Sequence, residues 1–200
     1  MKKKKLLVAL LAVNTLATAQ PERLQPIPAE KWVRSEAILL LQRFGEGVEK
    51  ALVCPLYDTE GTNELFTEDA TIQVTSLQSN TKKNYRPEPY WRALNGLICK
   101  GNAKYASALV SYSPTSADSV RIRTVNNACI ATYDLTQTFM SFSKKNGARS
   151  YCDVTIKKVV MIFWTNSQGI MEGKIKKVYA DHPEQCDQHA EIYSQSNHHR

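Results

Sequence analysis

The chain has 200 residues, of which 42% are hydrophobic and 22% are charged. This length fits one domain with a substantial core, and the composition excludes a disordered chain. The formal net charge is +7, but four of these charges come from Lys2–Lys5, so +3 remains for the rest. That remainder is too small to indicate nucleic acid or an anionic membrane as a partner.

The N-terminus has the pattern of a cleavable leader. The positive segment Lys2–Lys5 is followed by the apolar segment Leu6–Val13 and by Ala17-Thr18-Ala19, a small-residue cleavage site. This order predicts a secretory signal peptide over residues 1–19, in a bacterial style. The apolar run is far shorter than a membrane span, which needs about 20 residues. We therefore expect a periplasmic or secreted mature chain that starts near Gln20 and has no membrane span.

Export also bears on the cysteines. The five are Cys54, Cys99, Cys129, Cys152 and Cys186. An oxidising compartment allows disulfides, but five cysteines cannot all pair within one chain, and their connectivity stays open. The alternative for Cys129 is a small buried hydrophobic side chain.

The first half of the chain predicts mainly helices. Residues 20–28 hold three prolines and predict an extended lead-in. Apolar residues at helical spacing then predict an amphipathic helix from Ala29 to about Val53. The expected elements that follow are a helical turn at Glu64–Phe66, a strand at Ala70–Leu77, a loop at 78–84 and a second amphipathic helix from Glu88 to about Cys99.

After Gly101 the alternation of apolar and polar residues predicts strands only. They are Lys104–Ser113, Ser119–Val125, the two strands of a long hairpin between Cys129 and Trp164, and Ile170–Ala180. The single domain is thus expected to span residues 29–181, and residues 182–200 to form a polar C-terminal tail.

The hairpin is the central feature of this prediction. The turn is expected at Lys144–Gly147, with Asn146-Gly147 as its favoured two-residue centre. This centre places Tyr133 opposite Val160 and Gln137 opposite Ile156. One continuous apolar row results. The pair Lys157-Lys158 interrupts the row, so either Lys158 points inward beside Gln137 or a β-bulge shifts the phase there. The bulge is the preferred interpretation.

The order of these elements predicts an α+β fold. A strongly curved, mixed but mainly antiparallel sheet would be wrapped by about three N-terminal helices. The segment Asn63–Ile72 (NELFTEDATI) resembles the signature of the nuclear transport factor 2-like superfamily, and the helix with Tyr90–Leu94 and the long final strands match its order. The resemblance covers roughly Ala29 to Asp181 and implies a cone with a pocket between sheet and helices. The superfamily includes ketosteroid isomerases, scytalone dehydratases, SnoaL-like polyketide cyclases and non-enzymatic binding domains, so the fold leaves the function open.

The catalytic groups that the resemblance implies are missing. The base of the isomerases would follow the Ala-Thr segment, where this chain has Gln73, Val74 and Thr75. A dehydratase-type site needs histidines inside the cone, and the first histidine after the leader is His182. No catalytic residue is therefore assigned. The groups that remain as acid/base candidates are Tyr57, Asp58, Tyr133, Gln137, Asp153 and Lys158.

The residues expected to line a ligand pocket are Tyr57, Tyr90, Trp91, Tyr133, Gln137, Lys158 and Trp164. Gln137 needs hydrogen-bond partners on a buried face, which a ligand or neighbouring main chain would supply. Core packing is the alternative for the aromatic residues. The spacing of His182, Cys186 and His189 matches no tight zinc pattern, and no phosphate loop or cofactor motif is present, so neither a metal nor a cofactor is predicted.

Three functions stay open. The preferred hypothesis is an exported, non-catalytic binder of a small apolar or amphipathic ligand. The second is an interaction module that forms a homodimer through the outer sheet face. The third is an isomerase, dehydratase or cyclase-type enzyme with a rearranged acid/base set, such as Asp58 with Tyr133.

Overall fold

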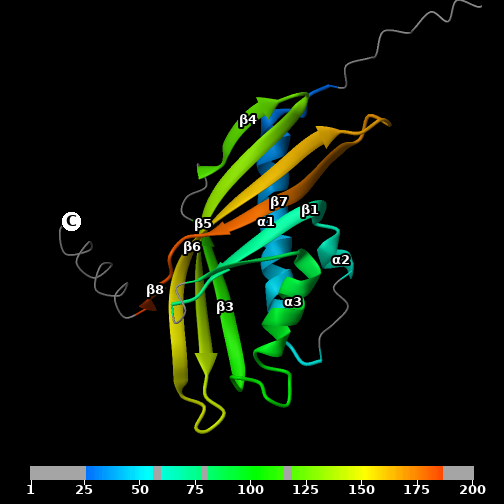
Figure 1. Cartoon of the computed structure of the whole chain (residues 1–200). Coiled ribbons are helices and arrows are strands. Elements are labelled where there is room, and N and C mark those ends of the chain that lie inside the picture. The colour runs from blue at the N-terminus through cyan, green and yellow to red at the C-terminus, as the bar shows by residue number, and fades with distance from the viewer. Residues whose placement is uncertain (1–25, 56–59, 78–80, 115–118, 187–200) are drawn as a thin grey trace, which may run out of the picture.

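Three helices lie on one side of a single curved sheet in the computed structural model, which describes residues 26–55, 60–77, 81–114 and 119–186 (Figure 1). The helices are α1 (Glu30–Ala51), α2 (Glu60–Asn63) and α3 (Pro87–Gly96). The strands are β1 (Phe66–Thr75), β2 (Lys82–Tyr85), β3 (Ser107–Pro114), β4 (Arg121–Val125), β5 (Ala128–Phe142), β6 (Arg149–Thr165), β7 (Met171–Ala180) and β8 (Glu184–Gln185). The predicted α+β class is confirmed.

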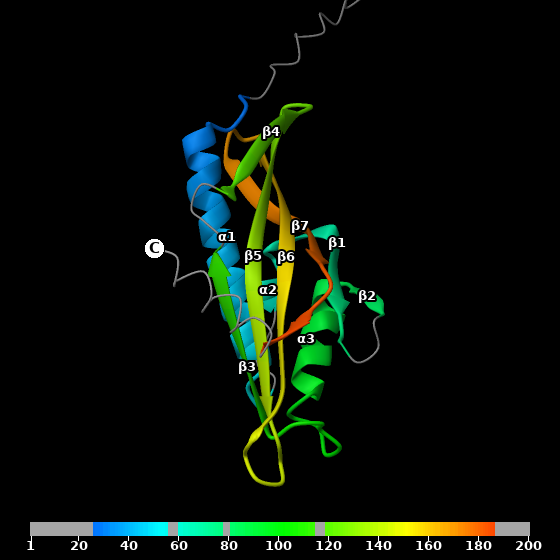
Figure 2. The same ribbon diagram turned by 90° about the vertical axis from the view of Figure 1, so that its left-hand side faces the viewer.

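The strand order is β2-β1-β7-β6-β5-β3, with β4 paired to β5 and β8 paired to β6. Only the pair β1–β7 is parallel among these strands; the others are antiparallel. Figure 2 looks onto the outer face of the long strands β5 and β6, with α1 and α3 behind them. The mixed, mainly antiparallel and curved sheet is therefore confirmed as well.

The helix α1 buries its apolar stripe against the inner face of the sheet. Val33, Ala37, Leu40, Phe44 and Val48 are all at most 2% exposed. The ring of Phe44 lies 5.8–6.1 Å from the rings of three aromatic residues of other elements, namely Phe66, Trp91 and Tyr112. Such aromatic contacts stabilise a core beyond simple area burial. This stripe is the one that the helical spacing predicts.

The hairpin between β5 and β6 differs from the prediction by one residue of register. The loop is Lys144–Gly147 rather than Asn146-Gly147, because the Gly147 N–H donates to the Ser143 carbonyl and only Gly147, at φ +68°, is left-handed. Phe142 pairs with Arg149 but Ser141 pairs with Tyr151, so Ser150 is the extra residue of a β-bulge. The turn lies at the predicted residues Lys144–Gly147, but the two-residue centre that set the predicted register is wrong.

A shift of one residue exchanges the two faces of a strand. In β6, Lys157 is therefore the inward lysine, 3% exposed, and Lys158 lies exposed on the outer face opposite Asp134. The ladder between β5 and β6 is regular at this point. The bulge expected at Lys157-Lys158 is wrong, and so is the alternative in which Lys158 points inward.

Three smaller differences concern local structure. The helical turn expected at Glu64–Phe66 is wrong: Phe66 already belongs to β1, where it packs at 6.1 Å from both Phe44 and Trp91. The predicted loop 78–84 contains the start of β2. The left-handed pair of a tight hairpin turn occurs instead at Asn126 (φ 46°) and Asn127 (φ 62°), between β4 and β5.

Two disulfides join elements that are distant in sequence. Cys54 after α1 pairs with Cys99 after α3, and Cys152 of β6 pairs with Cys186. Cys129 is a free, buried thiol, as its alternative interpretation expected. The predicted tail starts at His182, yet β8 and Cys186 hold residues up to 186 against β6. The predicted signal peptide lies outside the described residues. None of the helices in the described part is long and apolar enough to cross a membrane.

Candidate functional site

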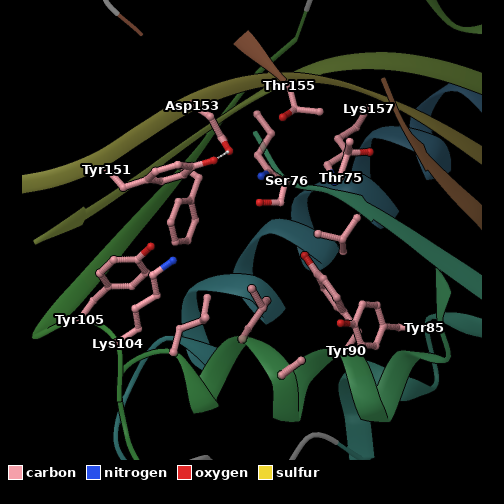
Figure 3. A pocket seen from close by; sticks show the side chains of 16 residues that line it. Thr75, Ser76, Tyr85, Tyr90, Lys104, Tyr105, Tyr151, Asp153, Thr155 and Lys157 are labelled. Carbon is pink, nitrogen blue, oxygen red and sulfur yellow. Dashed lines mark hydrogen bonds between the residues drawn. The ribbon is translucent and has the colours of Figure 1, made fainter. Parts of the chain in front are cut away.

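A cavity of about 230 Å³ lies between α3 and the inner face of the sheet (Figure 3). Strands β1, β5 and β6 form its roof, and α3 with the segment before β3 closes the other side. The lining residues are Val74, Thr75, Ser76, Tyr85, Tyr90, Ala93, Leu94, Leu97, Lys104, Tyr105, Gln137, Phe139, Tyr151, Asp153, Thr155 and Lys157. One part of this lining is apolar and another is polar and charged.

The apolar part comes mainly from α3 and its C-terminal turn. Ala93, Leu94 and Leu97 occur at spacings of one and three residues, so they share the helix face that meets the sheet. Phe139 of β5 lies opposite, with ring centroids 6.4 Å from Tyr105 and 6.0 Å from Tyr151. This part of the cavity can hold the apolar body of a ligand.

The polar part begins with a tyrosine and an aspartate of β6. The Tyr151 hydroxyl donates a hydrogen bond of 2.6 Å to Asp153 Oδ2, which Figure 3 shows as a dashed line. Asp153 is only 6% exposed. Burial raises the pKa of the Asp153 carboxyl, while the hydrogen bond from Tyr151 and the charge of Lys157 act in the opposite direction. Burial and the nearby carboxylate raise the pKa of Tyr151, so this phenol stays a hydrogen-bond donor.

Lys157 lies further along the same strand and on the same face. Its ammonium group donates to the main-chain oxygen of Gln73 at 3.3 Å, and among the described residues it makes no ion pair within 4.0 Å. Burial lowers the pKa of Lys157 to about 8, and the charge of Asp153 opposes this shift. At neutral pH the cavity therefore contains a cation that has lost most of its water.

Two further polar groups face the same space. The Thr75 hydroxyl oxygen is buried and has no hydrogen-bond partner within the described parts of the chain. Gln137 accepts a hydrogen bond of 3.5 Å from the Tyr112 hydroxyl through its Oε1. Figure 3 shows Thr75, Thr155 and Lys157 grouped on one side of the cavity, across from Lys104 and Tyr105. We call Thr75, Thr155 and Lys157 the polar corner.

The structure brings together only part of the predicted pocket. Tyr90 and Gln137 line the cavity. Trp91 and Tyr133 lie in the core instead, where they are 0% and 2% exposed. The Trp91 indole N–H donates a hydrogen bond of 3.0 Å to Asn63 Oδ1.

The remaining predicted residues are elsewhere. Lys158 and Trp164 lie on the outer face of β6, away from the cavity, because the register of the hairpin differs by one residue. Tyr57 lies outside the described residues, as does the acid/base candidate Asp58.

The sequence interpretation missed most of the polar groups on β6. Tyr151, Thr155 and Lys157 were not expected in the pocket, and Asp153 was named only as an acid/base candidate. Their signal is present as a polar alternation, Tyr-x-Asp-x-Thr-x-Lys, over residues 151–157. The residues between them, Val154 and Ile156, are apolar, and their alternation predicts the opposite face of β6 as the buried one.

The cysteine and histidines of the C-terminal segment, for which no metal site is predicted, lie only partly within the described residues. Cys186 is in a disulfide, and His189 lies outside the described residues. Within residues 26–55, 60–77, 81–114 and 119–186, no group of three potential metal ligands is found.

Comparisons with known proteins extend the description of the fold. No protein-family model matches the chain, and no curated protein matches it. Solved structures do share its arrangement. A nuclear transport factor 2 (NTF2-like) superfamily protein from Salmonella enterica is 14% identical, with a TM-score of 0.47, over 79% of this chain and 96% of that one. The Kfla4162 protein from Kribbella flavida is 12% identical, with a TM-score of 0.49, over 78% and 95%.

A third similar structure is a type 2 hexachlorocyclohexane dehydrochlorinase, 8% identical with a TM-score of 0.43, over 78% of this chain and 92% of that one. One of these structures is described as nuclear transport factor 2-like, the superfamily whose signature the segment Asn63–Ile72 resembles. At these identities and TM-scores the likeness carries nothing about ligand, partner or activity.

Proposed function

We propose that this chain is an exported bacterial protein that binds a small apolar or amphipathic ligand, without catalysis, in the cavity between α3 and the sheet. The observation that carries the proposal is the division of one cavity into an apolar wall, from α3 and Phe139, and a polar corner on β1 and β6. Binding sites for small molecules combine these features: apolar walls give affinity, and a few polar groups fix orientation. The two disulfides and the predicted leader support export.

Native mass spectrometry of the mature protein, purified from its own compartment, tests this function. A retained ligand gives an excess mass that survives gentle desolvation and disappears on denaturation. The variant Leu94→Trp places a larger ring on the cavity wall and should abolish the excess mass. Arg92→Trp, on the exposed side of the same helix, is the control and should retain it. A wild-type protein without bound mass, which also takes up no apolar or amphipathic probe, would refute the proposal.

A second candidate is a homodimer through the outer sheet face. No helix among the described residues covers this face (Figure 2), and Ile156 and Tyr179 on it are 46% and 37% exposed. Exposed apolar residues on a strand face can mark a protein interface. Analytical ultracentrifugation of Ile156→Asp tests it, with Ile38→Asp on α1 as control because Ile38 is equally exposed, at 44%. A dimer that only the first change dissociates supports this candidate; a wild-type monomer contradicts it.

The enzyme hypothesis rests on Asp153, one of the expected acid/base candidates, instead of on the pair Asp58 with Tyr133. Tyr133 lies in the core, so it does not reach the cavity, whereas Asp153 does. A buried carboxyl with a raised pKa can act as a general base or acid. Turnover of an amphipathic probe that Asp153→Asn abolishes, while the probe still binds, would favour an enzyme over a binder.

A further inference from the structure

The polar corner contains a buried charge and a buried hydroxyl that the protein leaves partly unsatisfied. Lys157 is 3% exposed, yet its ammonium group has one hydrogen bond among the described residues, to the Gln73 carbonyl. An ammonium group can donate three. Thr75 is 7% exposed, and its hydroxyl oxygen has no partner in the same described residues. Buried polar groups normally have hydrogen-bond partners, so two such groups that lack some or all of them need an explanation.

Asp153 does not fully supply the missing partner. Its Oδ2 accepts the hydrogen bond from Tyr151, and no oxygen of Asp153 lies within 4.0 Å of Lys157 Nζ. The carboxyl acts on Lys157 by charge at a distance, and it accepts no hydrogen bond from the ammonium group. The cation therefore lies in a mostly dry corner with room for an acceptor on the cavity side.

We propose that the ligand is a small monocarboxylic acid, whose carboxylate accepts hydrogen bonds from Lys157 Nζ and the Thr75 hydroxyl while its apolar part lies against α3. This inference rests on the proposed ligand-binding function and deepens it. Lys157 is the buried cation of the corner, and a carboxylate brings two acceptor oxygens and one negative charge to it. A phosphate dianion would bring two negative charges beside the same cation and near the Asp153 carboxyl. Burial keeps the pKa of Lys157 near 8, which still leaves the ammonium form dominant at neutral pH.

The size and shape of the cavity agree with a small acid. Its volume of about 230 Å³ lies below the range of roughly 300–1,000 Å³ that drug-sized ligands occupy. The apolar residues Leu94 and Leu97 lie on the α3 side of the same space, so one molecule can contact both ends. An acid with a short alkyl or aryl group fits this cavity, with its carboxylate in the polar corner and its apolar group against α3.

The test compares linear acids from hexanoate to decanoate with the primary alcohols of the same lengths, by isothermal titration calorimetry at pH 7. The full mature chain is used, after removal of any retained ligand. We expect each acid that fits to bind at least about tenfold more tightly than its alcohol, since only the carboxylate adds an opposite charge to the hydrogen bond from Lys157. Lys157→Met should remove this preference and leave alcohol binding within about threefold of wild type.

Two matched lysine variants locate the effect. Lys158→Met changes the neighbouring residue on the outer face and should leave the preference intact. Lys104→Met removes the cation on the opposite side of the cavity, where Lys104 lies over the Tyr105 ring at 5.2 Å, and should also leave it intact. Loss of the preference in Lys104→Met but not in Lys157→Met would overturn the proposal.

The remaining outcomes separate this inference from the function on which it rests. If alcohols bind as tightly as acids to the wild type, the carboxylate assignment fails and the ligand-binding function stands. If neither series binds and the protein retains no ligand, both fail.

Discussion

Replacement of Lys157 by Met should change how the stability of the protein depends on pH. Burial lowers the pKa of this lysine from 10.5 to about 8, and the side chain is only 3% exposed. Between these two values the unfolded chain binds a proton that the folded chain does not. The free energy of unfolding of the wild type therefore rises with pH from about 8 to 10.5, because stability rises wherever the unfolded state binds more protons.

The size of the effect follows from the shift. One pKa unit corresponds to about 1.4 kcal/mol, so the full shift is worth about 3 kcal/mol. Between pH 7.5 and 9.5 the wild type should gain about 2 kcal/mol relative to Lys157→Met, because the variant has no group that titrates at this position. The comparison starts at pH 7.5 so that titration of the Asp153 carboxyl does not contribute to the difference.

Urea unfolding, followed by tryptophan fluorescence in non-reducing buffer, measures this difference. The chain has three tryptophans, and Trp91 is fully buried in the core. Lys158→Met is the matched control, since that exposed side chain is solvated in the folded and the unfolded state. Parallel stability curves for the wild type and Lys157→Met across this window would refute the assignment of Lys157 as a buried cation.

Three further predictions concern packing, the Tyr151–Asp153 bond and one disulfide, all measured by urea unfolding. Gly47→Ala should lose about 1–3 kcal/mol, because its Cβ would meet the Thr62 methyl group. The same change in a Thr62→Ser background should gain up to about 1 kcal/mol from helix propensity, and a loss in both backgrounds would contradict the clash. Tyr151→Phe should lose about 1–3 kcal/mol at pH 7 and less at pH 4, because burial raises the pKa of Asp153 above 3.8 and more of this carboxyl is protonated there; equal losses would show that the bond is not charge-assisted. Replacing the Cys54–Cys99 disulfide by two serines should lose about 4 kcal/mol, from a separation of 45 residues, and no loss would mean that the unfolded chain is not constrained by it.

The hairpin shows how far sequence patterns reach. The alternation along β5 correctly places Tyr133 and Leu135 on the buried face, because a period of two persists wherever one face of a strand meets a core. Which alternate residues of β6 face the core could not be predicted in the same way. This depends on a four-residue loop that ends at Gly147 and on the bulge at Ser150: the loop shifts the pairing by two residues and the bulge returns one. A register that is wrong by one residue is enough to place Lys158 in the cavity instead of Lys157.

The cavity itself was hidden for a related physical reason. A rule that buries apolar residues selects Val154 and Ile156 on β6, and these face outward at the level of the cavity. The inward residues Asp153, Thr155 and Lys157 are polar because a cavity, and not a packed helix, lies against them. Local patterns describe the average strand and do not describe the point where the core is left open.

The order of the main helices and strands, the buried stripe of α1 and the curved α+β arrangement could be predicted, because these depend on hydrophobic periodicity that each segment carries alone. Tertiary contacts set which lysine enters the cavity, which cysteines pair and where β8 is held. These outcomes depend on register and on contacts between residues distant in sequence, such as Lys157 with Gln73 and Cys152 with Cys186. A single strand holds no information about its neighbour's phase, so the site emerges only when the strands are paired.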